Sequence, residues 1–272
     1  MVIFMKEIRH GNTRHQTYPN QPRSYRYGWP SVIPSYLRRK LPLNQLLNKY
    51  EEGQVLLINK PYEWTSFDVI RKVRNLIKIK KVGHAGTLDP LATGLLIVCT
   101  GKFTKRINDF MAQEKEYTGS ITLGATTPTF DLESEPENIK DTAGITAAQL
   151  HEATLAFTGH ILQVPPMHSA IKKDGKRIYE LARRGETIEL EPRKLFIKTF
   201  EITSIAMPVL QFRVVCSTGT YIRSLANDFG AALGCGGYLS SLCRTAIGEY
   251  LLAGALSMEA LEAQVKAEKE AT

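Results

Sequence analysis

Residues 83–94 read Gly83-His84-Ala85-Gly86-Thr87-Leu88-Asp89-Pro90-Leu91-Ala92-Thr93-Gly94, and they lie between a predicted helix and a predicted buried strand. The three glycines permit tight turns, and Pro90 biases Asp89 toward an extended backbone and removes the next backbone donor. The loop is not a phosphate-binding P-loop, because it lacks the Gly-Lys-Ser/Thr ending. An Asp-Pro pair on its own is typical of an ordinary turn. The pattern therefore predicts a rigid loop that leaves the side chain of Asp89 available.

Outward from this loop, the sequence predicts alternating helices and hairpins. A strand over residues 55–59 precedes a helix that begins at an N-cap Ser66 and buries Phe67, Ile70, Val73, Leu76 and Ile77 at helical spacing. Further elements are predicted at 94–100 (strand), 102–111 (helix), 117–124 (strand), 146–157 (helix), 177–184 (helix), 194–206 with 210–217 (hairpin), 221–233 (helix) and from Met258 (helix). A glycine-rich break, Gly234 to Gly237, precedes the last helix. This irregular alternation favours an α+β fold with a mixed, mostly antiparallel sheet and flanking helices over a parallel doubly wound one.

The charge of the chain favours a polyanionic partner, but it is unevenly spread. The 272 residues carry 35 Lys plus Arg against 27 Asp plus Glu, a net charge of +8. Residues 1–40 contain eight of these cations and a single acid, Glu7, so most of the excess lies there. In the remainder, cations cluster at 71–81 and 172–184, while acids gather near Asp131 and in the last helix. Mixed helical faces also produce such clusters, so charge alone leaves the nucleic-acid interpretation open.

The four cysteines indicate a reducing compartment. Cys99, Cys216, Cys235 and Cys243 form no C-x-x-C pair and have no metal-like spacing with the six histidines, so we expect no zinc or other metal. Cys99 and Cys216 lie in apolar, strand-like runs where a buried thiol is usual. No apolar run reaches the length of a membrane helix, and the first ten residues lack a signal-peptide pattern. We expect a cytoplasmic protein that does not bind membranes.

Residues 1–45 are predicted to be a basic extension that is disordered or loosely docked. They mix Pro, Arg, Tyr and Asn without a sustained period. Residues 46–272 are then expected to form one domain that holds the chemistry.

The loop and several further segments resemble one known family. GHAGTLDPLATG is similar to the catalytic motif of bacterial tRNA pseudouridine-55 synthases, the TruB family. The resemblance continues in order along the chain through Asn59-Lys60-Pro61, Lys115-Glu116-Tyr117, VPPMHSAIKKDGKRIYELARRG, STGTYIRSLANDFG and LCRTAIG, which together cover roughly residues 50 to 260. Such matches are hard to reach by chance.

The resemblance implies a pseudouridine synthase fold with its active-site cleft on the sheet, and an enzyme without cofactor. It would turn one uridine in the T-loop of tRNA into its carbon-linked isomer. Asp89 matches the family's catalytic aspartate and Arg223 the arginine that pairs with it; whether Asp89 attacks the sugar, adds to the base or removes a sugar proton stays open. At ~4 Å and an effective dielectric near 20, such a pair is worth about 4 kcal/mol, which would keep a partly buried carboxylate ionised.

Other residues receive roles from the same resemblance. Tyr117 would stack on the target base, which contributes roughly 1–3 kcal/mol and offsets the energy of flipping that base. We expect His84 to contact RNA and fill the gap left by the flipped base, and Lys60 to support the same pocket; both are grouped as RNA-binding residues. Asp131 in TPTFD matches the family's substrate-approaching segment more loosely, and a loop-capping role is an equal alternative.

The pattern leaves two other function classes open. One is a non-catalytic RNA-binding or tRNA-folding protein that keeps the pocket without turnover. The other is a hydrolase that uses Asp89 and Asp131 as an acid and base pair. Family members commonly carry a C-terminal PUA domain, which we do not expect here because the sequence stops soon after the helix from Met258. The expected partner is the T-arm of tRNA, and the expected state is a monomer.

Overall fold

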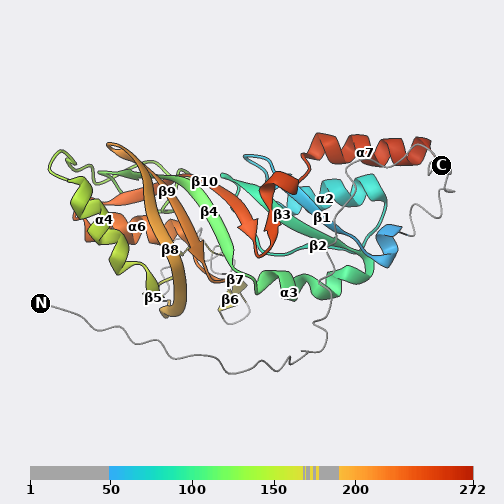
Figure 1. Ribbon diagram of the computed structural model, residues 1–272, viewed down its shortest axis with the longest axis horizontal. Coiled ribbons are helices and arrows are strands. Elements are labelled where there is room, and N and C mark those ends of the chain that lie inside the picture. The colour runs from blue at the N-terminus through green and yellow to red at the C-terminus, as the bar shows by residue number, and fades with distance from the viewer. Residues whose placement is uncertain (1–48, 168, 170–171, 174–175, 178–189, 272) are drawn as a thin grey trace, which may run out of the picture. The chain divides into compact units, whose positions relative to one another are not determined.

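The computed structural model describes residues 49–167, 169, 172–173, 176–177 and 190–271. The predicted extension over residues 1–45 lies outside the described residues, and so does the predicted helix over 177–184 apart from Arg177, which belongs to a short strand. Within the described part, the predicted α+β class with a mixed, mostly antiparallel sheet is confirmed (Figure 1).

A nine-stranded sheet organises the described part of the chain. Its order is β1-β3-β10-β4-β9-β8-β5, with β2 added to β3 and β11 to β10. Strands β3 and β10 pair in parallel, and the other pairs among the described strands are antiparallel. The strands are β1 (Val55–Lys60), β2 (Val82–His84), β3 (Ala92–Thr100), β4 (Lys115–Leu123), β5 (Gly159–Gln163), β8 (Arg193–Ala206), β9 (Val209–Cys216), β10 (Gly237–Ile247) and β11 (Tyr250–Leu251), and a separate hairpin joins β6 (Lys172–Lys173) to β7 (Lys176–Arg177).

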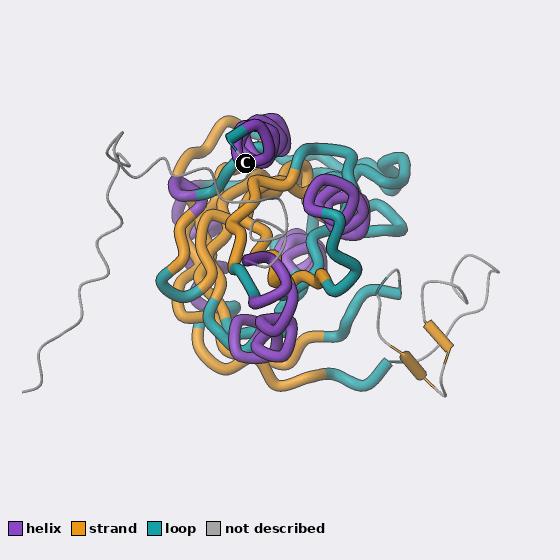
Figure 2. Tube along the Cα trace, turned by 90° about the vertical axis from the view of Figure 1, so that its right-hand side faces the viewer, coloured by secondary structure: helices purple, strands orange, loops and turns teal. Residues whose placement is uncertain are grey.

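Helices cover the sheet at both of its ends. The helices are α2 (Ser66–Ile77), α3 (Ile107–Met111), α4 (Ala147–Ala156), α6 (Ile222–Ala232) and α7 (Met258–Glu270), with short 3-10 turns η2 (Gly101–Arg106) and η3 (Leu252–Gly254). Figure 2 shows the helices outside the strands of the sheet. One apolar cluster joins α4 and α6 to β4, β8 and β9, and a second joins α2 and α7 to β1 and β3.

Strand β3 is buried on both faces, which explains its continuous apolar sequence. Leu96 and Val98 belong to the cluster under α2 and α7, whereas Leu95 and Ile97 pack on the opposite face with Phe110 of α3. A strand covered on both faces does not show the alternation of a half-exposed one. The loop that contains Asp89 leads directly into this buried strand, so the C-terminal end of the loop has a fixed position.

The start of α2 corrects the sequence prediction. Its N-cap is Thr65, not Ser66, and Thr65 forms a reciprocal capping box with Asp68. The buried face agrees with the prediction at Ile70, Val73 and Ile77, but Val69 is buried in addition and Phe67 is exposed. Ser66 is buried and is free to bond elsewhere.

The sequence analysis missed β10, which occupies the middle of the sheet between β3 and β4. Its alternation is interrupted by register shifts at Leu239/Ser241 and Arg244/Ala246 in its pairing with β4. Such bulges insert an extra residue and break the period of two that identifies a strand in sequence. No helix in the described part of the chain has the length and apolar character needed to cross a membrane.

Candidate active site

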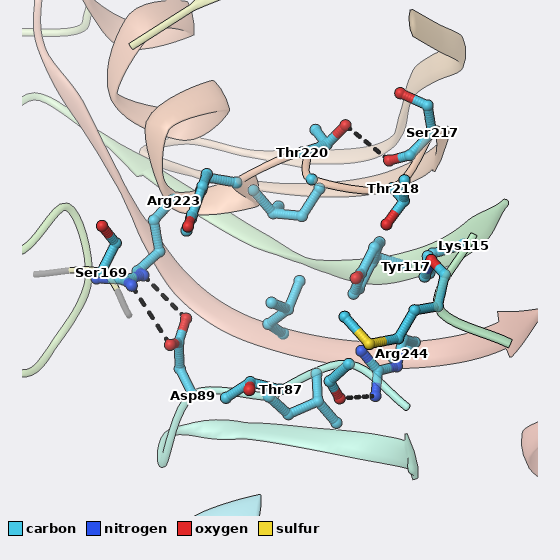
Figure 3. A pocket seen from close by; sticks show the side chains of 17 residues that line it. Thr87, Asp89, Lys115, Tyr117, Ser169, Ser217, Thr218, Thr220, Arg223 and Arg244 are labelled. Atoms are coloured by element: carbon cyan, nitrogen blue, oxygen red, sulfur yellow. Dashed lines mark hydrogen bonds and ion pairs between the residues drawn. The ribbon is translucent and has the colours of Figure 1, made fainter. Parts of the chain in front are cut away.

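A cavity of about 290 Å³ opens where the Asp89 loop meets β4, β10 and the start of α6. This is near the lower end of the ~300–1,000 Å³ usual for ligand pockets, a size that suits one nucleotide. Asp89 lies on one side of the cavity and Tyr117, Lys115 and Arg244 lie on the other (Figure 3). Its floor is on the sheet, as the fold prediction placed it.

The loop from Gly86 to Pro90 is held by side chains from three separate elements. Ser66 of α2 accepts a hydrogen bond from the amide of Leu88 at 2.9 Å and donates one to the Leu88 carbonyl at 3.1 Å. The ammonium of Lys60 in β1 donates to the Pro90 carbonyl at 3.1 Å and also to the carbonyls of Pro61 and Trp64. Arg244 of β10 donates to the Gly86 carbonyl at 3.1 Å. These bonds fix the backbone on both sides of Asp89, so its carboxylate has a defined position before any ligand binds.

Arg223 of α6 binds the carboxylate of Asp89 with two nitrogens. Nε lies 2.9 Å from Oδ2, and Nη2 donates to Oδ1 at 3.3 Å. The same Nε lies 3.6 Å from Oδ2 of Asp131, and Nη1 donates to the Thr129 carbonyl at 3.2 Å. The Arg223 side chain is 5% exposed, whereas the Asp89 side chain is 37% exposed. One buried cation therefore serves two carboxylates, of which Asp89 is the accessible one.

The pKa of Asp89 lies above the ordinary value of an aspartate. Burial in the loop is the largest cause, and the nearby carboxylate of Asp131 adds to the rise. The guanidinium of Arg223 acts in the opposite direction, both as a charge and as a hydrogen-bond donor, and Lys60 also lowers the pKa. The pKa of Asp89 is therefore set by the balance between burial and Asp131, which raise it, and Arg223 and Lys60, which lower it.

The opposite side of the cavity contains cations whose donors meet carbonyl groups. Arg244 is 1% exposed, and its Nε donates to the Leu95 carbonyl at 2.8 Å. Lys115 of β4 donates to the carbonyls of Met111 and Gln113 at the end of α3, and burial lowers its pKa to about 8. Tyr117 is buried beside Arg244, opposite it in the β4–β10 ladder, and burial raises the pKa of its phenol. A flat aromatic ring and two cations thus face Asp89 across the space.

The sequence-predicted residues do not all line this cavity. Asp89, Arg223 and Tyr117 line it, whereas His84, Lys60 and Asp131 are not among its described lining residues. Lys60 is 0% exposed, so its ammonium supports the loop from beneath and has no surface to offer RNA. Asp131 is 4% exposed and accepts a hydrogen bond from the Glu133 amide at 3.0 Å, a contact of the kind that the loop-capping alternative predicts.

His84 ends β2, two residues before the loop, and is half buried. Burial is the largest cause of a lowered pKa for its ring; the nearby Arg244 lowers this pKa further, while the Gly86 backbone acts in the opposite direction. Its Nδ1 has no hydrogen-bond partner among the described residues. The described residues also contain no group of three or more His, Cys, Asp or Glu side chains arranged to hold a metal ion.

Sequence reasoning missed two residues of the cavity, Lys115 and Arg244. Both stood in segments that carried the resemblance, but neither received a role. Arginine and lysine are almost never fully buried unless they are paired or hydrogen-bonded. A cation within an apolar strand is therefore the sequence pattern that could have identified these two residues. Leu242, Arg244 and Ala246 have that pattern in β10, but the strand itself had not been recognised.

Comparisons with known proteins agree with this geometry. Residues 74–222 match the TruB family pseudouridylate synthase (N terminal domain), and residues 223–272 match the tRNA pseudouridylate synthase B C-terminal domain. The chain is 54% identical over 221 residues to tRNA pseudouridine synthase B of Flavobacterium johnsoniae, covering 79% of this chain and 96% of the relative. It is 51% identical over 216 residues to the protein of that name from Parabacteroides distasonis, covering 77% and 92%.

Solved structures show the same fold. The chain superimposes on one from the crystal structure of a Cbf5-Nop10-Gar1 complex with a TM-score of 0.62 and 26% identity, covering 83% of this chain and 57% of that one. A chain from an H/ACA RNP bound to a substrate RNA containing 2'-deoxyuridine gives a TM-score of 0.63 at 24% identity, covering 85% and 59%. From the family matches and the identity to these relatives, this chain belongs to the TruB family of pseudouridylate synthases and is a tRNA pseudouridine synthase.

Proposed function

We propose that this synthase isomerises the uridine at position 55 in the T-loop of tRNA, with Asp89 as its catalytic carboxylate and with the target nucleotide flipped into the cavity. The observation that carries this proposal is the bidentate pair between Arg223 and Asp89. The carboxylate of Asp89 faces Tyr117 across a cavity with space for one nucleotide.

The reaction needs an anion at the position of Asp89. The N1–C1' bond of uridine breaks with its electron pair on the base, so positive charge develops on the sugar. A fixed carboxylate beside C1' stabilises that charge. The base then turns, C5 bonds to C1', and the proton of C5 is replaced by one on N1, so the mass of the RNA does not change. Because the loop is held by Ser66, Lys60 and Arg244, the carboxylate requires little reorganisation.

The remaining residues have supporting roles in this proposal. Tyr117 stacks on the flipped base, and His84 contacts the RNA beside the vacated stack. Lys60 holds the loop from beneath, and Asp131 shares Arg223 with Asp89 and so tunes the carboxylate. Residues 46–272 form the catalytic domain, which acts as a monomer on the T-arm of tRNA. The free cysteines, three of them buried, fit a cytoplasmic enzyme.

The two alternatives receive less support from the geometry. A hydrolase needs its acid and base on opposite sides of the scissile bond. Asp89 and Asp131 instead bind the same guanidinium, and Asp131 is buried behind it. A non-catalytic RNA-binding protein needs no carboxylate held in the cavity by a buried arginine.

The test uses unmodified tRNA transcript with the wild-type protein and with Asp89→Asn, followed by chemical mapping of pseudouridine. We expect product at one T-loop uridine with the wild type and a loss of at least about 10³-fold with the variant. Product at the wild-type rate from Asp89→Asn, or product at another position, would contradict the proposal. Release of free uracil would indicate the hydrolase, and binding without product from the wild type would indicate the non-catalytic protein.

Asp89→Asn is expected to fold. Since the pKa of Asp89 is raised in the fold, its stabilising contribution is present at low pH and is lost as pH rises through the folded pKa. The folded state therefore favours the protonated, uncharged carboxyl of Asp89 over the ionised one, and the uncharged amide of Asn should not lower the free energy of unfolding measured in urea.

A further inference from the structure

Exposed cations gather at the end of β3 that lies farthest from Asp89. The turn after α2 supplies Lys78, Lys80 and Lys81, and the 3-10 turn η2 supplies Lys102, Lys105 and Arg106. The two segments are adjacent because the Gly101 amide donates to the Lys81 carbonyl at 2.8 Å and Val82 pairs with Thr100. We call these six residues the distal lysine surface.

Most of this surface lacks neutralising partners. Lys102 pairs with Glu52 at 2.7 Å and Arg106 with Asp109 at 3.5 Å. The remaining four, Lys78, Lys80, Lys81 and Lys105, make no ion pair with an acid in the described part of the chain.

Cations on the neighbouring helix α2 behave differently. Arg71 pairs with Asp68 and Lys72 with Glu262, each at 2.6 Å. Local pairing is therefore available to these two cations of α2, whereas four of the six cations of the distal lysine surface make no such pair with a described acid. Unpaired cations held side by side repel one another, and an anionic partner relieves that repulsion.

The centre of the surface is hollow. An open depression of about 450 Å³ is lined by Lys78, Lys80, Lys81 and Lys102 together with Ile79, Gly101 and Glu51. Glu51 is its one acidic lining residue among those described. Four ammonium groups around such a depression are complementary to the phosphates of a nucleic-acid backbone, which lysines bind without reading sequence.

Distance separates this surface from the cavity. Strand β3 runs from Ala92, three residues after Asp89, to Thr100 beside the surface. Eight steps at ~3.3 Å span roughly 26 Å. A B-form DNA duplex, which rises ~3.4 Å per base pair, takes about eight pairs to cover that span. The A-form duplex of RNA is more compact along its axis and needs more pairs than that. The partner must therefore be an RNA that extends well beyond the loop containing the target uridine.

We propose that the distal lysine surface docks the phosphate backbone of tRNA outside the T-loop, while the T-loop occupies the cavity. This inference rests on the proposed function. In tRNA the T-arm and acceptor arm stack into one long duplex, which has the required length. A hairpin made of the T-loop on a short stem does not reach the surface.

The experiment compares two RNAs and two kinds of variant in the full-length protein. The RNAs are an unmodified tRNA transcript and a T-arm hairpin with a short stem. The variants are Lys80→Glu and Lys81→Glu, singly and together, and the matched control is Lys140→Glu, which makes the same charge change at an exposed lysine in the loop after β4. Dissociation constants are measured from 50 to 200 mM salt, and the rate of pseudouridine formation is measured on both RNAs.

We expect the double variant to lose about tenfold or more in affinity for full tRNA near 100 mM salt. The slope of log K against log salt should fall by about 0.9 for each lost phosphate contact. Affinity and rate on the hairpin should stay within about twofold of wild type, and Lys140→Glu should behave as wild type on both RNAs.

Three outcomes would overturn the inference. Binding of full tRNA by the double variant as tightly as by the wild type refutes the docking. An equal loss on the hairpin refutes the distance argument, and an equal loss with Lys140→Glu reduces the effect to net charge. Failure of the proposed function is distinguishable, because it would appear as absent product from the wild type on both RNAs.

Discussion

The two sides of the cavity each contain a buried arginine, and the two arginines do different work. Arg223 meets charged groups, the carboxylates of Asp89 and Asp131, whereas Arg244 meets neutral carbonyls of Gly86 and Leu95. Both hold the same loop, one by the side chain of Asp89 and the other by the backbone. The difference shows that one arginine sets the charge environment of the Asp89 carboxylate and the other positions the backbone of its loop. Substituting each arginine should therefore change a different property of the enzyme.

Removing Arg223 should have the largest effect. Arg223→Met leaves two carboxylates without their buried counter-charge, which destabilises the fold by about 3–5 kcal/mol. The pKa of Asp89 rises further, so the acid limb of the rate profile should move to higher pH. Urea unfolding and single-turnover rates between pH 5 and 9 measure both effects.

The matched control for Arg223 is Arg213→Met. Arg213 also binds two carboxylates, Glu116 and Glu201, but on the surface, where such pairs contribute about 0–1 kcal/mol. An equal loss of stability in both variants would mean that burial does not distinguish the two arginines.

Removing Arg244 should have an intermediate effect. Arg244→Met leaves the Gly86 and Leu95 carbonyls without these donors, and we expect a loss of about 2–3 kcal/mol in unfolding free energy. The displaced loop should lower the single-turnover rate by about 10²-fold at every pH, because position and not ionisation has changed. If Arg244→Met moved the acid limb of the pH–rate profile and left the maximal rate unchanged, the two arginines would not have the different roles inferred here.

Removing the second carboxylate should have the smallest effect. Asp131→Asn takes a like charge away from Asp89, which lowers the pKa of Asp89 and moves the acid limb to lower pH. On the plateau above the acid limb, the rate should stay within about twofold of the wild-type rate. A limb that moves upward, or does not move, would show that Asp131 does not influence Asp89.

The sequence predicted the parts of the fold that local patterns encode. The β8–β9 hairpin that turns at Met207-Pro208 and the helix capped by Thr146 are confirmed. By contrast, β10 was missed because its bulges near Ser240 and Thr245 interrupt the alternation. No local pattern marks a strand that begins in a glycine-rich turn and pairs with residues more than one hundred positions away.

The candidate site was predictable only where a motif carried it. The pairing of Asp89 with Arg223 was expected from resemblance, and the structure places the two side chains in contact. The bonds from Ser66 to Leu88 and from Lys60 to Pro90 were not predictable, because a buried polar residue reveals its partner only after folding. Lys60 was therefore grouped with the RNA-binding residues, whereas in the structure it is fully buried and its ammonium binds the backbone of the Asp89 loop.

The parallel pairing of β3 with β10 has a consequence for biosynthesis. Strand β10, in the middle of the sheet, is synthesised about 150 residues after β3. Residues 92–94 therefore have no pairing partner until residues 242–244 have been synthesised. Long-range pairing of this kind slows folding, since the intervening chain must first be closed into a loop. During translation both halves of the sheet emerge before their shared central strand, so a nascent chain that has not yet released β10 lacks two residues that line the cavity, Leu242 and Arg244.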